Sequence, residues 1–364
     1  MIDRIADLHC DSALEIQGGA DLVAGNPEGH VDLDRLERGG VKLQVFVSYV
    51  SSAFPEERAF AEACGLIDGV EDLCLRSGGR LAKADGAADA ERALKEGAET
   101  VAILAVENGH AIAGEIANLE RLRRRGVRYM TLTHSRHLSW AAGSGQPLAG
   151  TVGLSSFGKK VVEAMNDLGV IVDVSHVHES TFWDVAACSK KPFIASHSDA
   201  AALCPTPRNL TDDQLRAVAD SGGLVGVNFF PGLLDPDYER DIGASLGDLF
   251  ARLREVELRT IDDARSRLSE YRRLFGEMRE RTRSRKVPLD LVVDHIEHIM
   301  KIAGEDAVAF GSDFDGAPEL PEGLGDCSSF PRLLERMRER GFRESAIEKI
   351  AYGNFLRVLS EADR

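Results

Sequence analysis

Short apolar runs alternate with longer amphipathic stretches along most of this chain. Eight runs rich in β-branched residues occupy residues 4–9, 41–49, 100–107, 127–134, 169–176, 192–198, 223–230 and 307–315. Apolar residues recur at helical spacing over 55–77, 114–125, 155–168, 178–190, 211–221 and 288–303. Eight strand signals alternating with helix signals predict an α/β fold, a (β/α)8 TIM-type barrel. An open doubly wound sheet is the second interpretation, but no G-x-G-x-x-G motif follows the first run to favour it.

Two stretches lie outside this alternation. Residues 238–286 are dense in charge with apolar residues at helical spacing, so we interpret them as a charged helical insertion before the last strand, serving as a lid or an interface. Its basic end, "RERTRSRK", is interpreted as a solvated helix face because acidic residues interleave upstream. Residues 329–364 predict two amphipathic helices packed on the barrel. We therefore expect residues 1–364 to form a single barrel domain.

The composition excludes several classes of partner. The 364 residues are 43% hydrophobic and 29% charged, with a formal net charge of −16. A net-acidic chain without a basic stripe is a poor binder of nucleic acid. No run approaches the roughly 18 apolar residues of a membrane span, and the first residues lack a signal-peptide pattern. We expect no nucleic-acid partner and no membrane partner.

The six cysteines favour a reducing compartment. They lie at positions 10, 64, 74, 188, 204 and 327, without a C-x-x-C pair or a disulfide-like spacing. Together with the missing signal pattern, this predicts a cytoplasmic protein.

Ionisable residues gather where the predicted strands end. In a parallel barrel the chemistry sits at the carboxyl ends of the strands. His9 and Asp11 are two residues apart at the end of the first run, a spacing that places both side chains on one face of a strand. The other runs end in Glu107, His134, His176, His197 and Asp313. Four of the ten histidines at the same end of four strands indicate a metal site rather than a random scatter.

The types of ligand narrow the chemistry. Imidazoles and carboxylates without thiolates suit zinc or a similar divalent ion. The candidates outnumber the three protein ligands of a typical catalytic zinc, so a two-metal site with a bridging carboxylate is the economical solution. Such a pair lowers the pKa of a shared water from about 15.7 towards about 7 and provides a hydroxide nucleophile. Asp313 is placed to pass a proton to a leaving amine.

The motifs resemble a known family. The stretches are "DLHCDS", "AVENGHAI", "YMTLTHS", "GLSSFGKKVVEAMNDLGVIVDVSHV", "PFIASHSDAAALCPTPRNLTDDQL", "VGVNFF" and "AFGSDFDG". In this order, across residues 7–316, they resemble the membrane (renal) dipeptidase family, the zinc dipeptidases of peptidase family M19. The resemblance implies a barrel of the metal-dependent hydrolase kind. It also implies cleavage of dipeptides, often with a D-residue at the second position, and frequent dimers.

The resemblance also implies a metal-ligand set. His9 and Asp11 would bind one zinc ion and His176 and His197 a second, with Glu107 bridging both. This gives two Zn²⁺ per chain.

Three further roles follow from the same resemblance. His134 would contact the scissile carbonyl and stabilise the developing oxyanion. Arg208, in "PRN", would pair with the C-terminal carboxylate of the substrate, which suits a planar guanidinium. Asp313 would be the proton shuttle.

Other polar residues receive structural interpretations. His110 is interpreted as a supporting group, His178 as a rim or surface residue and Asp315 as a loop-forming or supporting carboxylate. His295 and His298, an i, i+3 pair, resemble a helical metal site, but the strand-end residues already account for a metal.

The leading hypothesis is a zinc-dependent dipeptidase that hydrolyses free L-Xaa-L-Xaa and L-Xaa-D-Xaa dipeptides. One alternative is another amide or lactam hydrolase on the same binuclear barrel. The other is a catalytically silent metal-binding homologue, which would have no need of Asp313 or His134. The partners we expect are small dipeptides and further copies of the chain, as a homodimer or higher homo-oligomer.

Overall fold

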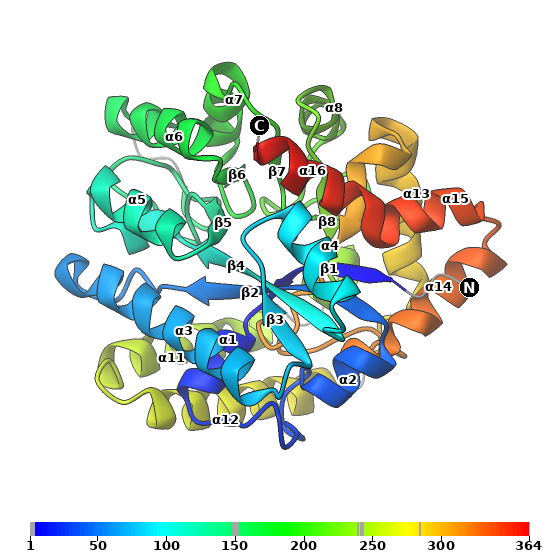
Figure 1. The fold of residues 1–364 in the computed structure, drawn as a ribbon, viewed down its shortest axis with the longest axis horizontal. Helices are drawn as coiled ribbons and strands as arrows, with labels where there is room; N and C mark the ends of the chain where they lie inside the picture. The colour runs from blue at the N-terminus through cyan, green and yellow to red at the C-terminus, as the bar shows by residue number, and fades with distance from the viewer. Residues whose placement is uncertain (1–3, 148–152, 239, 241–243, 284, 364) are drawn as a thin grey trace.

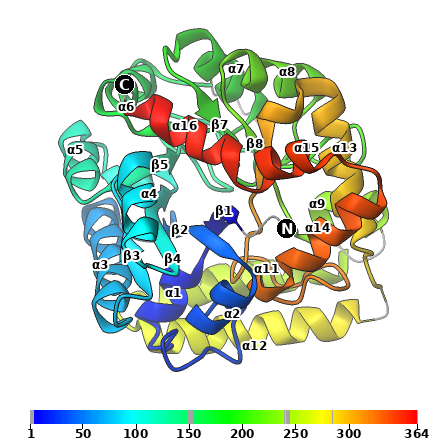
Figure 2. The same cartoon turned by 45° about the vertical axis from the view of Figure 1, so that its right-hand side comes forward.

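A parallel sheet forms the centre of the molecule. The computed structural model describes residues 4–147, 153–238, 240, 244–283 and 285–363. The strands are β1 (Ile5–Cys10), β2 (Val41–Tyr49), β4 (Thr100–Glu107), β5 (Val127–Thr131), β6 (Ile171–Asp173), β7 (Phe193–Ile194), β8 (Val225–Val227) and β9 (Val308–Phe310). They pair in the order β7-β6-β5-β4-β2-β1-β9-β8, and a parallel bridge from Ala195 to Val225 links the two ends. The predicted barrel is confirmed, with helices around it (Figures 1 and 2).

The predicted helices are present with small shifts of their ends. They are α3 (Glu56–Arg76), α5 (Ile116–Arg124), α6 (Ser156–Leu168), α7 (Glu179–Cys188), α8 (Asp212–Asp220) and α13 (Asp290–Ala303). Helix α8 begins where predicted because Thr211 and Gln214 form a reciprocal capping box.

Several short elements escaped the prediction. They are β3 (Leu81–Lys83), which pairs with β4, and helices α1 (Ser12–Gln17), α2 (Leu33–Arg38), α4 (Ala87–Lys95), α9 (Pro231–Leu234) and α10 (Pro236–Tyr238). Most are too short to show a periodic pattern. The carboxyl-terminal stretch holds three helices instead of two: α14 (Phe330–Glu339), α15 (Glu344–Glu348) and α16 (Asn354–Ala362), the last two joined by a π-helical turn.

Alternating side chains on the strands fill the inside and the outside of the barrel. On β4, Val101, Ile103 and Ala105 belong to an inner core together with residues of α16, whereas the residues between them belong to the outer core under the helices. Glu107 continues the inward series at the end of β4, because successive side chains on a strand alternate between the two faces. This parity directs its carboxylate into the barrel mouth.

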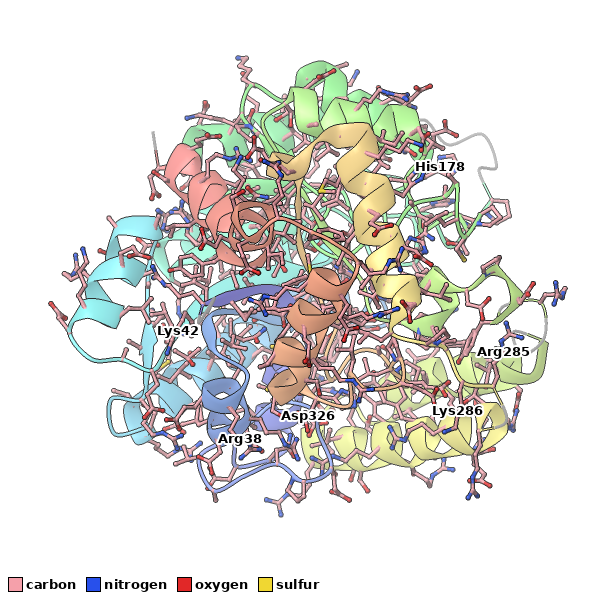
Figure 3. The ribbon with its side chains drawn as sticks, turned by 90° about the vertical axis from the view of Figure 1, so that its right-hand side faces the viewer. Arg38, Lys42, His178, Arg285, Lys286 and Asp326 are labelled. Atoms are coloured by element: carbon pink, nitrogen blue, oxygen red, sulfur yellow. The ribbon has the colours of Figure 1, made fainter. Side chains whose placement is uncertain are left out.

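The predicted insertion is helical. It contains α11 (Ala244–Arg259) and α12 (Ala264–Thr282), while residues 239, 241–243 and 284 lie outside the described part. Its basic end is paired with acidic groups: Arg281 lies 2.6 Å from Asp248, and Lys286 lies 2.8 Å from Glu322. Figure 3 shows Lys286 at the outer surface. Arg281, Arg283 and Lys286 are exposed, as expected of a solvated helix face.

All six cysteines are free thiols. Among the described residues, no helix has the length and apolar character needed to cross a bilayer.

Candidate metal centre

The strand-end residues singled out in the sequence meet at the mouth of the barrel. Their ligand atoms form three overlapping groups, in each of which all atoms lie within 4.8 Å of one another. The groups are His9, Glu107 and His197; Glu107, His134 and His176; and His9, Asp11 and Asp313. Because the groups share His9 and Glu107, they make one continuous site.

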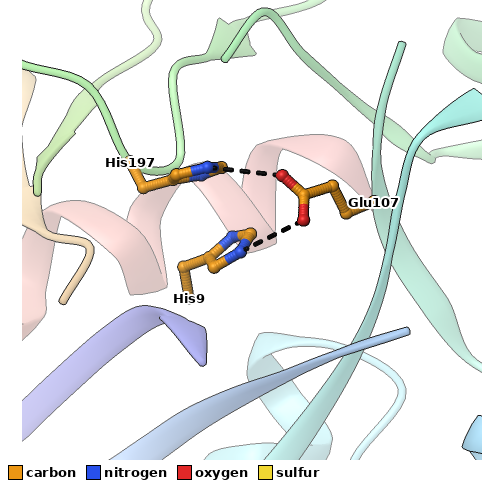
Figure 4. A group of neighbouring side chains, drawn as sticks. All are labelled: His9, Glu107 and His197. Atoms are coloured by element: carbon orange, nitrogen blue, oxygen red, sulfur yellow. Dashed lines mark ion pairs between the residues drawn. The ribbon is translucent and has the colours of Figure 1, made fainter. Parts of the chain in front are cut away.

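Glu107 lies between two sets of possible ligands. Its Oε1 is 3.0 Å from His176 Nε2 and 3.4 Å from His197 Nε2, and its Oε2 is 3.8 Å from His9 Nε2. Figure 4 shows this carboxylate facing His9 and His197. Asp11 Oδ2 lies 3.8 Å from His9 Nε2, on the same side as Glu107 Oε2. One carboxylate oxygen therefore faces two imidazoles, and the other faces an imidazole paired with a second carboxylate.

Most of these residues lie beyond the strands that were predicted to end in them. Strands β5, β6, β7 and β9 stop three residues before His134, His176, His197 and Asp313, respectively, and β1 stops at Cys10, one residue before Asp11. The prediction that these residues end the strands is therefore wrong in detail. The backbone continues past the end of each strand and turns over the mouth of the barrel before side chains from different strands can meet.

The local backbone is correspondingly unusual. His176 and Asp313 have φ values of 65° and 63°, in the left-handed region that non-glycine residues rarely occupy. Such conformations cost energy and persist where the surrounding structure enforces them, commonly at functional sites. A Cβ atom at Gly316 would overlap Asp11 Oδ2 and Asp313 Oδ1, so a larger residue here would displace both carboxylates.

Two imidazoles are held with Nε2 directed into the site. The Tyr129 hydroxyl donates to the Leu8 carbonyl at 2.7 Å, so it accepts from His9 Nδ1 at 3.1 Å. This contact places the proton of His9 on Nδ1 and leaves the Nε2 lone pair for a metal, the usual arrangement of a metal-binding histidine.

His197 is oriented in the same way by a short relay. Ser196 Oγ donates to Asp173 Oδ2 at 2.6 Å and therefore accepts from His197 Nδ1 at 2.8 Å. Tyr129, Ser196 and Asp173 were not predicted as site residues from the sequence. The sequence carries one signal that could have identified such residues, a polar side chain within a buried strand run, as at Asp173.

The unsatisfied atoms of the site fit a divalent cation. In the part of the chain that the structure describes, His9 Nε2, Asp11 Oδ1 and Glu107 Oε1 are buried without a hydrogen-bond partner. An orphaned buried polar atom costs about 1–3 kcal/mol, and several in one place need a common partner. Imidazole nitrogens and carboxylate oxygens together are a donor set for zinc and similar ions.

The electrostatics favour the ligand forms of these groups. Burial alone raises the pKa of Glu107, but His176, His9 and His134 outweigh burial and hold that pKa well below its ordinary value. Burial lowers the pKa of His176 well below its ordinary value, and Arg208 and His134 lower it further. The site thus combines an ionised carboxylate with a neutral imidazole, the forms that bind a metal.

The remaining carboxylates are destabilised as anions. Burial, followed by repulsion from Glu107 and Asp313, raises the pKa of Asp11 well above its ordinary value. Burial raises the pKa of Asp313 against the attraction of His9. Bound cations would reverse this penalty, because an ion is the largest local charge in such a site.

The ligand cluster forms part of the lining of a cavity of about 370 Å³. Residues of α11 and α12 line the same cavity, among them Phe250, Leu253, Tyr271 and Phe275. The cavity therefore combines a polar, ligand-bearing region with a wall of apolar and aromatic side chains from the insertion.

Two of the remaining predicted residues have defined contacts at this site. Asp313 Oδ2 accepts from Asn228 Nδ2 at 3.1 Å. The His134 ring packs edge-on against Tyr49, with centroids 4.8 Å apart, and its Nδ1 lies 2.9 Å from Ser135 Oγ.

Arg208 is bonded to the segment that carries His197 and does not line the cavity of the candidate ligands. Its guanidinium donates to the His197 carbonyl at 3.0 Å and to Ser198 Oγ at 3.2 Å. It lines a neighbouring cavity of about 280 Å³ that also involves Ser144 and His178.

The histidines outside the cluster have structural partners. His110 Nε2 lies 2.8 Å from the Phe54 carbonyl, and His178 accepts from the Ser180 amide at the start of α7. His295 accepts from the Ala200 amide, and His298 pairs with Asp212 at 2.7 Å. The i, i+3 pair on α13 therefore does not form a metal site. Asp315 accepts from Ser12 Oγ at 2.5 Å and from the His30 amide, as expected of a supporting carboxylate.

Comparisons with known proteins agree with this geometry. A model of the family described as membrane dipeptidase (peptidase family M19) matches residues 3–364. A curated relative from Klebsiella pneumoniae, an uncharacterised protein in the pqqA 5′ region, is 35% identical over 297 residues, covering 80% of this chain and 92% of the relative.

Several solved structures with the same fold are described as metallopeptidases or dipeptidases. One is a metallopeptidase from Rhodobacter sphaeroides bound to a phosphinate mimic of L-Ala-D-Ala, with TM-score 0.80, 26% identity and 99% coverage of both chains. A second, dipeptidase AC of family M19, has TM-score 0.81 and 27% identity and covers 100% of this chain and 99% of its own. A third, the probable dipeptidase PvdM from Pseudomonas aeruginosa, has TM-score 0.76 and 26% identity and covers 93% and 89%.

Fold and site together define a barrel hydrolase that depends on metal. The chain belongs to the membrane dipeptidase family, peptidase family M19, which confirms the resemblance seen in the motifs. It is accordingly a metal-dependent dipeptidase.

Proposed function

We propose that this enzyme is a zinc dipeptidase that hydrolyses free L-Xaa-L-Xaa and L-Xaa-D-Xaa dipeptides. The main supporting observation is the Glu107 carboxylate, with one oxygen near His176 and His197 and the other near His9. The Rhodobacter sphaeroides neighbour, bound to a mimic of L-Ala-D-Ala, supports an L,D substrate.

The proposed metal ligands form two sets, one on each side of the Glu107 carboxylate. His9 and Asp11 would hold one zinc ion, His176 and His197 a second, and Glu107 both. When bound, such an ion pair lowers the pKa of a water molecule towards about 7 and polarises the substrate carbonyl.

The other residues act on the substrate. His134 would donate a hydrogen bond to the carbonyl oxygen as it gains charge. An Asp313 carboxylate oxygen would take a proton from the attacking water and pass it to the leaving amine nitrogen, with Asn228 holding its orientation. Arg208 would pair with the C-terminal carboxylate of the dipeptide, which restricts the enzyme to substrates that end one residue after the scissile bond.

We further propose that the enzyme works in the cytoplasm as a homodimer or higher homo-oligomer. The free thiols favour a reducing compartment, and the oligomeric state rests on the family resemblance. Gel filtration with light scattering tests the assembly, and a monomer would contradict it.

The function is tested by ninhydrin detection of amine release from a panel of dipeptides. The panel contains L,L and L,D pairs and their C-terminal amides, and the protein is supplied with zinc. We expect cleavage of free dipeptides, little cleavage of the amides, and loss of activity after chelation. Binding of two zinc ions without cleavage of any dipeptide would contradict the proposal and favour another amide or lactam substrate.

A further inference from the structure

The insertion contributes a carboxylate to the cavity that contains the candidate metal ligands. Glu257 lies on α11, is half-buried, and lines this cavity together with Glu107 and His134. It is not a member of any of the metal-ligand groups. Its function therefore has to be sought in its own surroundings.

Three hydroxyl groups hold the Glu257 carboxylate in place. Tyr49 Oη and Tyr271 Oη donate to Oε1 at 3.1 and 2.9 Å, and Ser51 Oγ donates to Oε2 at 2.5 Å. Tyr49 and Ser51, from β2 and the loop after it, tie α11 to the barrel, and Tyr271 ties α12 to α11. A carboxylate has about four acceptor positions, and these donors fill three of them.

The negative charge of Glu257 has no paired cation. Within the described residues, no arginine, lysine or histidine nitrogen lies within 4.0 Å of its oxygens. Arg254, one turn earlier on α11, lines the same cavity but is exposed and forms no ion pair with Glu257. An ionised carboxylate that lines a ligand cavity without a counter-ion is a favourable partner for a cationic ligand group.

Glu257 is close to the reacting centre. Tyr49, one of its hydroxyl donors, pairs in register with Glu107 across β2 and β4. The Tyr49 ring also packs edge-on against His134. One tyrosine side chain thus separates the Glu257 carboxylate from the metal-ligand cluster.

We propose that Glu257 binds an ammonium group in the amino-terminal residue of the dipeptide. The inference rests on the proposed dipeptidase function and assigns the recognition of the substrate amine to the insertion. The ammonium is either the α-amine or a side-chain amine of that residue, and both would form the same charge-assisted hydrogen bond.

The test uses Glu257→Gln in the full-length, zinc-loaded protein. Glutamine keeps the shape of the side chain and an oxygen that accepts from the tyrosines, but it removes the charge. The substrates form two matched pairs: Ala-Ala with propionyl-Ala, which lacks the α-amine, and Lys-Ala with norleucyl-Ala, which lacks the side-chain amine. Glu255→Gln, an exposed position on the same helix, is the control.

Recognition of the α-amine predicts that the variant loses about 10- to 100-fold in kcat/KM on Ala-Ala, mainly through KM, with propionyl-Ala unchanged. Recognition of the side-chain amine predicts a loss on Lys-Ala alone, with norleucyl-Ala unchanged. If Glu257 only holds the insertion on the barrel, the variant should lose activity equally on all four substrates. That result, or no loss on any substrate, would overturn the proposal.

A binding measurement separates this inference from the proposed function. Calorimetric titration with a phosphinate mimic of Ala-Ala and with its deamino counterpart needs no turnover. Wild-type protein that binds both mimics equally overturns the α-amine assignment even if it cleaves dipeptides. Wild-type protein that neither cleaves dipeptides nor binds either mimic overturns the proposed function as well.

Discussion

The barrel mouth and the helical insertion contribute to one cavity by different means. At the mouth, the candidate ligands come from several strands and the connections that follow them, and several buried polar atoms lack protein partners. The insertion is attached through ion pairs and hydroxyl contacts, and one face of α11 lines the cavity. The closed sheet fixes atoms that must converge on a metal, whereas a helix face adds shape and charge around the substrate. We therefore expect mutations at the barrel mouth to affect the reaction, and mutations in the insertion to affect substrate selectivity.

The largest effect is expected at the centre of the barrel mouth. Glu107→Gln removes the charge facing three imidazoles, so we expect loss of metal and a fall in kcat/KM of about 10³-fold or more. Metal content is measured by atomic emission beside dipeptide hydrolysis. Glu57→Gln, at an exposed position on α3, is the control. Full activity with Glu107→Gln would remove the basis of the proposed site.

The attachment of the insertion is tested at Arg267 on α12. This buried guanidinium lies 2.6 Å from Glu62, and both side chains are largely shielded from solvent. Arg267→Met leaves Glu62 without its partner, which costs about 3–5 kcal/mol for a buried pair. We expect faster hydrogen exchange over residues 244–283 with the bound metal retained. If the variant also loses its metal, metal binding at the barrel mouth depends on the attachment of the insertion.

The junction between the two regions should show a pH dependence. His295 on α13 accepts from the Ala200 amide in the loop after β7 and contacts the Leu234 carbonyl, just before the insertion. Burial lowers the pKa of His295 to about 4, against an ordinary 6.5. Between these pH values the unfolded state therefore binds a proton at His295 that the folded state does not bind. The contribution of His295 to folding stability is fully present above about pH 6.5 and decreases as the pH falls towards 4.

Each pKa unit corresponds to about 1.4 kcal/mol, so wild type should lose about 3 kcal/mol more than His295→Gln between pH 7 and pH 4. Urea unfolding of both proteins at several pH values measures the difference. Parallel curves for the two proteins would contradict the assignment to His295.

A smaller effect is expected from the residues that orient the ligands. Ser196→Ala breaks the relay from Asp173 to His197 but leaves every candidate ligand in place. Loss of such a supporting contact typically costs about 10- to 100-fold in metal affinity. Competition with a chromogenic chelator measures the affinity, and the exposed Ser345→Ala is the matched control. An unchanged affinity would show that His197 is positioned without the relay.

The sequence by itself determined the barrel and the identity of the clustered residues. The alternation of strand and helix signals is a local pattern, and parallel strands bring their carboxyl ends to one edge, so His9, Glu107 and His197 were predicted to meet without knowledge of coordinates. Local patterns also located the six main helices, because burial of one helix face imposes a period that a sequence displays.

Only the tertiary structure decided how those residues are held and what surrounds them. Tyr129 contacts the Leu8 carbonyl across 121 positions of the chain, and Ser51 contacts Glu257 across 206. No periodicity links residues so far apart, because such contacts depend on which loops fold over the barrel mouth. For the same reason the sequence did not indicate that Arg208 would be bonded to the His197 carbonyl. Local spacing fixed the alternation of strands and helices and the types of candidate ligand, while long-range packing fixed the order of the strands, the tautomers and the wall of the cavity.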